Sequence, residues 1–88
     1  MNINEAKNQT VHYAVGAHMA AAGFFLGLSS WPVTGIVFLT ALTIETLQYF
    51  FADGRRLKLA DRIMDISFYI IGARVMQILI EVLTGVSI

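Results

Sequence analysis

The sequence contains no cysteine, and it has only one proline in 88 residues. The missing cysteine excludes disulfides, thiolate chemistry and cysteine-based metal sites. Charged residues are also scarce, at 14% of the chain against about a quarter in an ordinary soluble domain. Six basic residues balance six acidic ones, so no net field attracts polyanions. We expect no nucleic-acid partner, no metal and no cofactor.

Apolar residues dominate what is present. They make up 57% of the chain, whose mean hydropathy is +0.68. A soluble domain this small buries only about 60% of the surface that its unfolded chain exposes, too little to hide so much apolar area. The composition therefore predicts an integral membrane protein with membrane lipid as its surroundings.

Three apolar runs predict three transmembrane helices, because about 20 apolar residues cross a bilayer as a helix. We place the helices at about residues 11–30, 33–52 and 62–84. The connections are short, which favours antiparallel neighbours. The predicted fold class is an all-α polytopic membrane protein, a small antiparallel bundle that forms one domain over residues 1–88.

Two features at the ends of the first apolar run bear on its structure and packing. The polar residues 1–10 fit either the beginning of the first helix or a disordered tail. Gly23 and Gly27 are four residues apart and allow a second helix to approach closely, most simply the second helix of the same chain. The same pair is a candidate contact for a homo-oligomer.

Most charged residues lie around the polar loop at residues 53–61, between the second and third apolar runs. Glu45 and Gln48 share one helix face, and an ionisable group this far inside a membrane helix usually faces a bundle interior or a wet cavity. Asp61 and Asp65 likewise share a face at the start of the third helix. We expect the following side chains to meet there: Glu45, Gln48, Arg55, Arg56, Asp61 and Asp65.

Three interpretations of these polar residues remain open. They form a hydrogen-bonded network that fixes two helices in register, a binding site for a lipid headgroup or small polar ligand, or a catalytic site. The sequence shows neither a Ser/His/Asp arrangement nor metal-ligand spacing, so we expect a non-enzymatic role. His12 and His18 are six residues apart, on different helix faces, and we interpret neither as a ligand.

A second polar stripe, Arg74, Gln77 and Glu81, lies within the third run. An arginine near the middle of a membrane helix costs about 2.5–3.5 kcal/mol on insertion scales, so Arg74 requires a partner. We predict an intramembrane pair with Glu45, which lies at a similar depth, or with Glu81, two turns along the same helix. This stripe is the other candidate face for a homo-oligomer.

The residues from Glu45 to Gly72 resemble the VanZ-like family of small bacterial membrane proteins. Glu45-x-x-Gln48 resembles the first family element, Arg55 or Arg56 the loop arginine, and Asp61-x-x-x-Asp65 the paired acidic positions. Gly72 resembles the second glycine of a pair, and Phe68 stands in place of the first. The resemblance implies an envelope protein, in some members linked to resistance to glycopeptide antibiotics of the teicoplanin type.

Two functional hypotheses follow. The first is a VanZ-like membrane protein with a binding or structural role centred on the polar residues. The second is an oligomeric, holin-like protein of phage origin that permeabilises the membrane. Basic residues concentrate in the 53–61 loop and at Arg62. They predict that this loop and the N-terminus face the cytoplasm, in a bacterial inner membrane.

Overall fold

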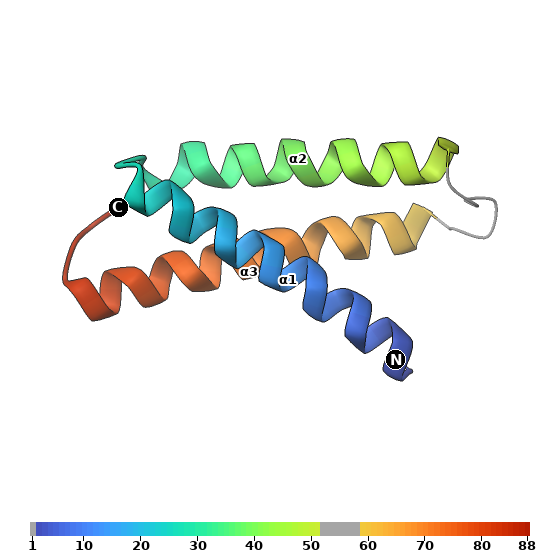
Figure 1. Ribbon diagram of the computed structural model, residues 1–88, viewed down its shortest axis with the longest axis horizontal. Coiled ribbons are helices and arrows are strands. Elements are labelled where there is room, and N and C mark those ends of the chain that lie inside the picture. The colour runs from blue at the N-terminus through green and yellow to red at the C-terminus, as the bar shows by residue number, and fades with distance from the viewer. Residues whose placement is uncertain (1, 52–58) are drawn as a thin grey trace.

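The computed structural model describes residues 2–51 and 59–88, which form three α-helices. These are α1 (Ile3–Phe25), α2 (Ser30–Phe51) and α3 (Leu59–Thr84). Helices α2 and α3 run antiparallel, and α1 crosses α3 obliquely (Figure 1). The all-α prediction is confirmed for the described residues, and the predicted first helix begins eight residues earlier than expected.

The two ends of α1 explain its length. Asn2 is the N-cap, and its side chain accepts a hydrogen bond from the Glu5 N–H at 2.9 Å, so the polar N-terminal residues are helical. At the other end Gly27 has φ +78°, and the Leu28 N–H donates to the Gly23 carbonyl at 2.9 Å. This is a Schellman motif, in which glycine adopts the left-handed conformation that closes the helix.

Glycines set the distances between helices. A Cβ on Gly16 would overlap the Tyr69 carbonyl oxygen of α3, and a Cβ on Gly72 would overlap the Tyr13 carbonyl oxygen of α1. Gly23 packs against the side chain of Val33 in α2, as the sequence predicts. Gly27 has no neighbour within 4 Å of a built Cβ, so it serves the turn and not the predicted packing.

The interior is small and partly polar. Its apolar core consists mainly of short side chains from all three helices: Ala20, Val33, Val37, Ala41, Tyr69 and Ala73. The largest fully buried side chains include Gln77 and Glu45, which are 1% and 2% exposed. Large apolar side chains such as Phe25 and Phe51 are instead 84% and 82% exposed. Polar groups inside and apolar groups outside are the arrangement that a bilayer favours.

Among the described residues, two helices are long and apolar enough to cross a membrane, at Ser30–Phe51 and Ala60–Thr84. The first helix does not meet this criterion, so the prediction of three spans is supported for α2 and α3 only. The first turns of α1 carry Glu5 and Lys7, and its second half is rich in alanine and glycine. These small residues let α1 pack closely on α3.

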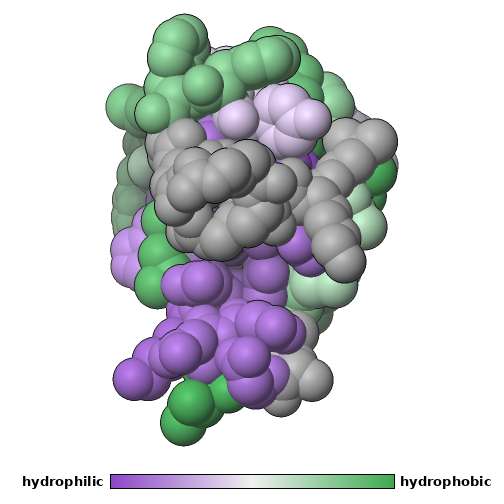
Figure 2. All heavy atoms as spheres, turned by 90° about the vertical axis from the view of Figure 1, so that its right-hand side faces the viewer, coloured by the Kyte–Doolittle hydropathy of each residue, from purple (hydrophilic) through white to green (hydrophobic). Residues whose placement is uncertain are grey.

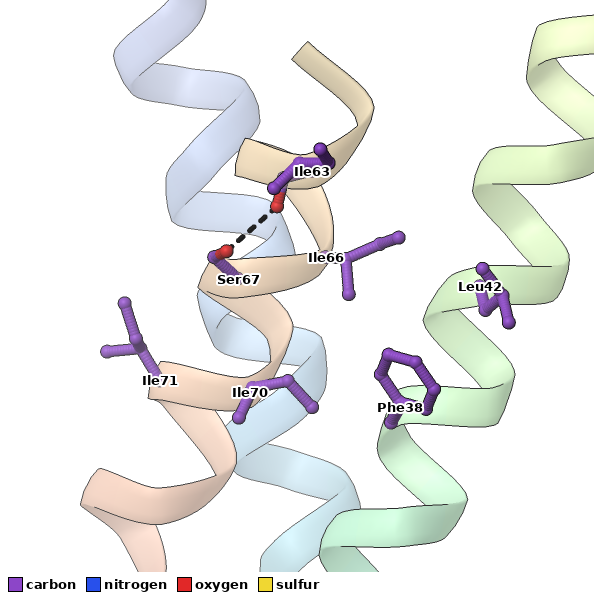
Figure 3. Close-up of a pocket in the computed structure, with 7 residues that line it drawn as sticks. All are labelled: Phe38, Leu42, Ile63, Ile66, Ser67, Ile70 and Ile71. Atoms are coloured by element: carbon purple, nitrogen blue, oxygen red, sulfur yellow. Dashed lines mark hydrogen bonds between the residues drawn. The ribbon is translucent and has the colours of Figure 1, made fainter. Parts of the chain in front are cut away.

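An apolar groove of about 660 Å³ runs between α2 and α3 (Figure 3). Phe38 and Leu42 line it from α2. The α3 side consists of Ile63, Ile66, Ser67, Ile70 and Ile71. The Ser67 hydroxyl donates to the Ile63 carbonyl at 2.8 Å, so this polar group is satisfied within its own helix.

Candidate functional site

A charged contact joins the end of α2 to the start of α3. Glu45 lies two turns before the end of α2, and Arg62 lies one turn into α3, so the antiparallel arrangement places them at the same level. Arg62 Nη1 is 2.6 Å from Glu45 Oε1, and Arg62 Nη2 is 3.1 Å from Asp65 Oδ2. Arg62 Nη1 also donates to Gln48 Oε1 at 2.9 Å. One guanidinium thus contacts three side chains on two helices.

Helix α1 completes this arrangement with Gln9 and His12, which are one turn apart. Gln9 Nε2 donates to Asp65 Oδ1 at 2.7 Å, and His12 Nδ1 lies 3.0 Å from Gln9 Oε1. His12 Nδ1 is 3.6 Å from Asp65 Oδ1, and the imidazole packs on the Tyr69 ring with centroids 4.9 Å apart. We call the following residues the polar cluster: Gln9, His12, Glu45, Gln48, Arg62 and Asp65.

Glu45 is not fully satisfied in this cluster. Its contact with Arg62 has the distance of an ion pair, but no hydrogen bond of good geometry reaches either carboxylate oxygen from the described residues. Arg62 Nε is also without a hydrogen-bond partner there. A buried polar atom without a partner costs about 1–3 kcal/mol, and more when it is charged. Glu45 Oε2 is thus an acceptor available for a further group.

The formal charges of the polar cluster do not cancel. Glu45 and Asp65 contribute two negative charges when ionised, and Arg62 contributes one positive charge. Burying unbalanced charge is unfavourable, because a low-dielectric interior strengthens repulsion and withdraws solvation. The cluster therefore favours an additional proton, cation or hydrogen-bond donor.

Arg62 lies between two pockets of different character. A polar pocket of about 340 Å³ is lined by Glu5, Asn8, Gln9, Asp61, Arg62, Met64 and Asp65. A mainly apolar pocket of about 400 Å³ is lined by Leu42, Glu45, Thr46, Tyr49, Phe50, Arg62, Ile63 and Ile66. Figure 2 views this end of the molecule, where hydrophilic side chains gather over the start of α1 and hydrophobic ones over the end of α2.

The structure brings together three of the six predicted cluster residues, Glu45, Gln48 and Asp65. Asp61 is exposed and lines the polar pocket, while Arg55 and Arg56 lie outside the described residues. Sequence reasoning missed Arg62 as the cluster's cation, although its three-residue spacing to Asp65 is a usable signal. Gln9 and His12 were also missed, because only the crossing of α1 over α3 brings them to the cluster.

The predicted intramembrane pair of Arg74 with Glu45 is not formed. Arg74 Nη1 donates to Gln77 Oε1 at 2.6 Å, and its guanidinium carbon lies 4.3 Å from the centroid of the Trp31 ring. The antiparallel arrangement sets Arg74 beside Trp31, about 20 Å along α2 from Glu45 at 1.5 Å per residue. Glu81 instead accepts a hydrogen bond from the Ile88 N–H at 3.2 Å.

Gln77 is the centre of this second polar contact. Its Nε2 donates to the Ser30 carbonyl at 3.0 Å, and its Oε1 accepts from Thr34 Oγ1 at 3.2 Å as well as from Arg74. The side chain is 1% exposed, so these bonds form inside the helix bundle. The stripe predicted from Arg74, Gln77 and Glu81 therefore faces partners within the chain.

A family model described as VanZ/LLP1 matches residues 3–80, nearly all of the three helices. The match includes Gln9 and His12 of α1 together with the α2 and α3 members of the polar cluster. No curated protein and no solved structure matches the chain.

Proposed function

The chain belongs to the VanZ/LLP1 family, and we propose that it is a small integral membrane protein of the cell envelope that binds a lipid headgroup at its polar cluster. The observation that carries this proposal is the place of Arg62, which lines both the polar and the apolar pocket. A ligand with a polar head and an apolar chain fits such a boundary. The family match and the two apolar helices fit a small membrane protein.

The polar pocket favours a headgroup that carries an amine. Its lining includes three carboxylates, from Glu5, Asp61 and Asp65, against the single guanidinium of Arg62. An ammonium group has three donors for these acceptors, and Arg62 offers donors to a neighbouring phosphate. An amine-bearing phospholipid headgroup is therefore complementary to the pocket.

The acyl chain of such a lipid has a continuous apolar path. The apolar pocket beside Arg62 shares Leu42, Ile63 and Ile66 with the groove between α2 and α3 in Figure 3. This groove extends along α3 to Ile70 and Ile71, away from the polar cluster. A lipid tail already lies in apolar surroundings, so the groove contributes van der Waals packing and not a gain from leaving water.

We also propose that the polar cluster lies at the cytoplasmic face of a bacterial inner membrane. Four of the six basic residues lie within residues 55–62, and cytoplasmic segments next to membrane helices are rich in lysine and arginine. The N-terminus begins at the same end of the molecule (Figure 1). The holin-like alternative has less support, because Gln77 of its candidate assembly face is buried within the chain.

Native mass spectrometry of the purified protein tests the lipid proposal. We expect phosphatidylethanolamine to remain bound longer than phosphatidylglycerol of the same chain length. Asp61→Asn should abolish this preference, because Asp61 is exposed and lines the polar pocket. Glu81→Gln, which removes a distant carboxylate, is the matched control and should keep it. Equal retention of both lipids by the wild-type protein would leave the polar cluster as a packing network and overturn the proposal.

A further inference from the structure

We propose that His12, Glu45 and Asp65 bind a divalent transition-metal cation of the zinc type within the polar cluster. Each side chain offers one ligand atom, and these atoms lie within 4.8 Å of one another. One imidazole and two carboxylates are ligands that zinc accepts in proteins, with a fourth position open to water. The three residues come from three different helices, which explains why sequence spacing gives no metal motif.

The unpartnered oxygen of Glu45 supports the site independently of this grouping. Glu45 is 2% exposed, and its Oε2 receives no hydrogen bond from the described residues. Asp65 is also buried, at 7% exposed. Direct coordination to a cation supplies the partner that such a carboxylate otherwise lacks.

Arg62 contacts only one oxygen of Glu45 and one oxygen of Asp65, so the other oxygen of each can bind a cation. Its Nη1 contacts Glu45 Oε1, and its Nη2 contacts Asp65 Oδ2. The oxygens that Arg62 does not contact are Glu45 Oε2 and Asp65 Oδ1. Asp65 Oδ1 accepts from Gln9 Nε2 at 2.7 Å and lies 3.6 Å from His12 Nδ1, and its second lone pair is left for a cation. The guanidinium and a metal ion can therefore use different oxygens, and the excess negative charge of the cluster attracts the cation.

Two neighbours hold the proposed ligands in position. Gln9 contacts both His12 and Asp65, and Tyr69 packs against the imidazole. Ligand atoms on one tetrahedral zinc lie about 3 Å apart, given metal–ligand bonds of about 2 Å. Small side-chain rotations are thus sufficient to close the site around an ion.

Metal analysis of the purified full chain tests the proposal. After equilibration with zinc and removal of excess, we expect about one zinc per chain by elemental analysis. His12→Gln should lose most of this zinc. His18→Gln is the matched control, since His18 lies exposed on the same helix with its Nδ1 2.6 Å from the Ala14 carbonyl oxygen. Gln9→Ala should weaken zinc binding about tenfold or more, the effect typical of removing a group that orients metal ligands.

The visible absorption of bound cobalt is a second measurement, and it reports on the geometry of the metal site itself. Cobalt bound to the wild-type protein and to His18→Gln should give the visible absorption of a low-coordinate site, and His12→Gln should not. Circular dichroism verifies that each variant keeps its helices. No zinc on the wild-type protein, or equal zinc on the two histidine variants, would overturn the proposal. Lipid retention measured with a chelator present, and with Asp61→Asn, tests the lipid proposal separately.

Discussion

Gly16 of α1 and Gly72 of α3 each leave room for a backbone carbonyl of the opposite helix, at Tyr69 and Tyr13. The relationship is reciprocal, because each tyrosine lies three residues before the glycine on its own helix. The same crossing sets His12 against the Tyr69 ring and Gln9 against Asp65. The polar cluster therefore depends on how closely these two backbones approach.

Gly72→Ala is expected to destabilise the protein, since the new methyl would meet backbone and not a side chain that can move aside. Overpacking typically costs about 1–3 kcal/mol, and the rigid neighbour favours the upper end. Gly35→Ala is the control, because a Cβ there has nothing within 4 Å. Thermal unfolding in detergent measures both, and equal midpoints for the two variants would contradict the prediction.

Glu45 and Arg62 should be strongly coupled. Arg62→Ala leaves two buried carboxylates without their cation and should cost about 3–5 kcal/mol, whereas Glu45→Ala leaves Arg62 paired with Asp65 and should cost less. Arg62→Ala combined with Glu45→Ala should therefore cost less than the sum of the single variants. A double-mutant cycle by equilibrium unfolding gives the coupling energy.

The control for this cycle is Arg74→Ala combined with Glu45→Ala. The two residues are far apart and have separate partners, so their effects should add within about 0.5 kcal/mol. Coupling between Arg74 and Glu45 as large as that between Arg62 and Glu45 would contradict the positions found for these side chains.

Trp31 should report on Arg74, because it is the only tryptophan and lies against the guanidinium. Arg74→Leu removes this cation–π contact, which is worth about 0.5–1 kcal/mol at an exposed site. We expect a shift in the tryptophan emission maximum. Arg62→Leu alters the other end of the bundle and should leave the emission unchanged, so identical spectra for wild type and Arg74→Leu would argue against the contact.

Gln77→Leu should destabilise the bundle more than Gln48→Leu. The first substitution removes the hydrogen bonds of Gln77 with Ser30, Thr34 and Arg74 from the interior of the bundle. The Thr34 hydroxyl and the Ser30 carbonyl keep only their bond to each other, at 2.9 Å. An unsatisfied buried polar group costs about 1–3 kcal/mol. Gln48 is exposed, so water replaces its contact with Arg62. Urea-dependent unfolding in detergent compares the two variants.

The sequence predicts well what depends on local pattern. The helices follow from the apolar runs, and the inward face of Glu45 follows from the cost of charge in lipid. It predicts poorly which side chains of two helices contact each other, because this depends on how far one helix is shifted along the other. A similar distance from the same loop predicts a pair of Arg74 with Glu45, whereas the antiparallel arrangement places Arg62 beside Glu45.

The first helix illustrates the same difference. Its alanines and glycines are compatible both with lipid and with a neighbouring helix, and hydropathy alone does not separate these surroundings. Gly16 contacts α3 and Gly23 contacts α2, so these glycines face a neighbouring helix. Gln9 and His12 gain their partners only from this packing.

The division of the polar cluster among three helices has a consequence for biogenesis. The α2–α3 hairpin alone can form the contact between Glu45 and Arg62, but Asp65 receives Gln9 only after α1 has docked. A chain whose first helix has not yet joined the others therefore has no complete site. Completion of the polar cluster and docking of α1 are therefore the same step of assembly.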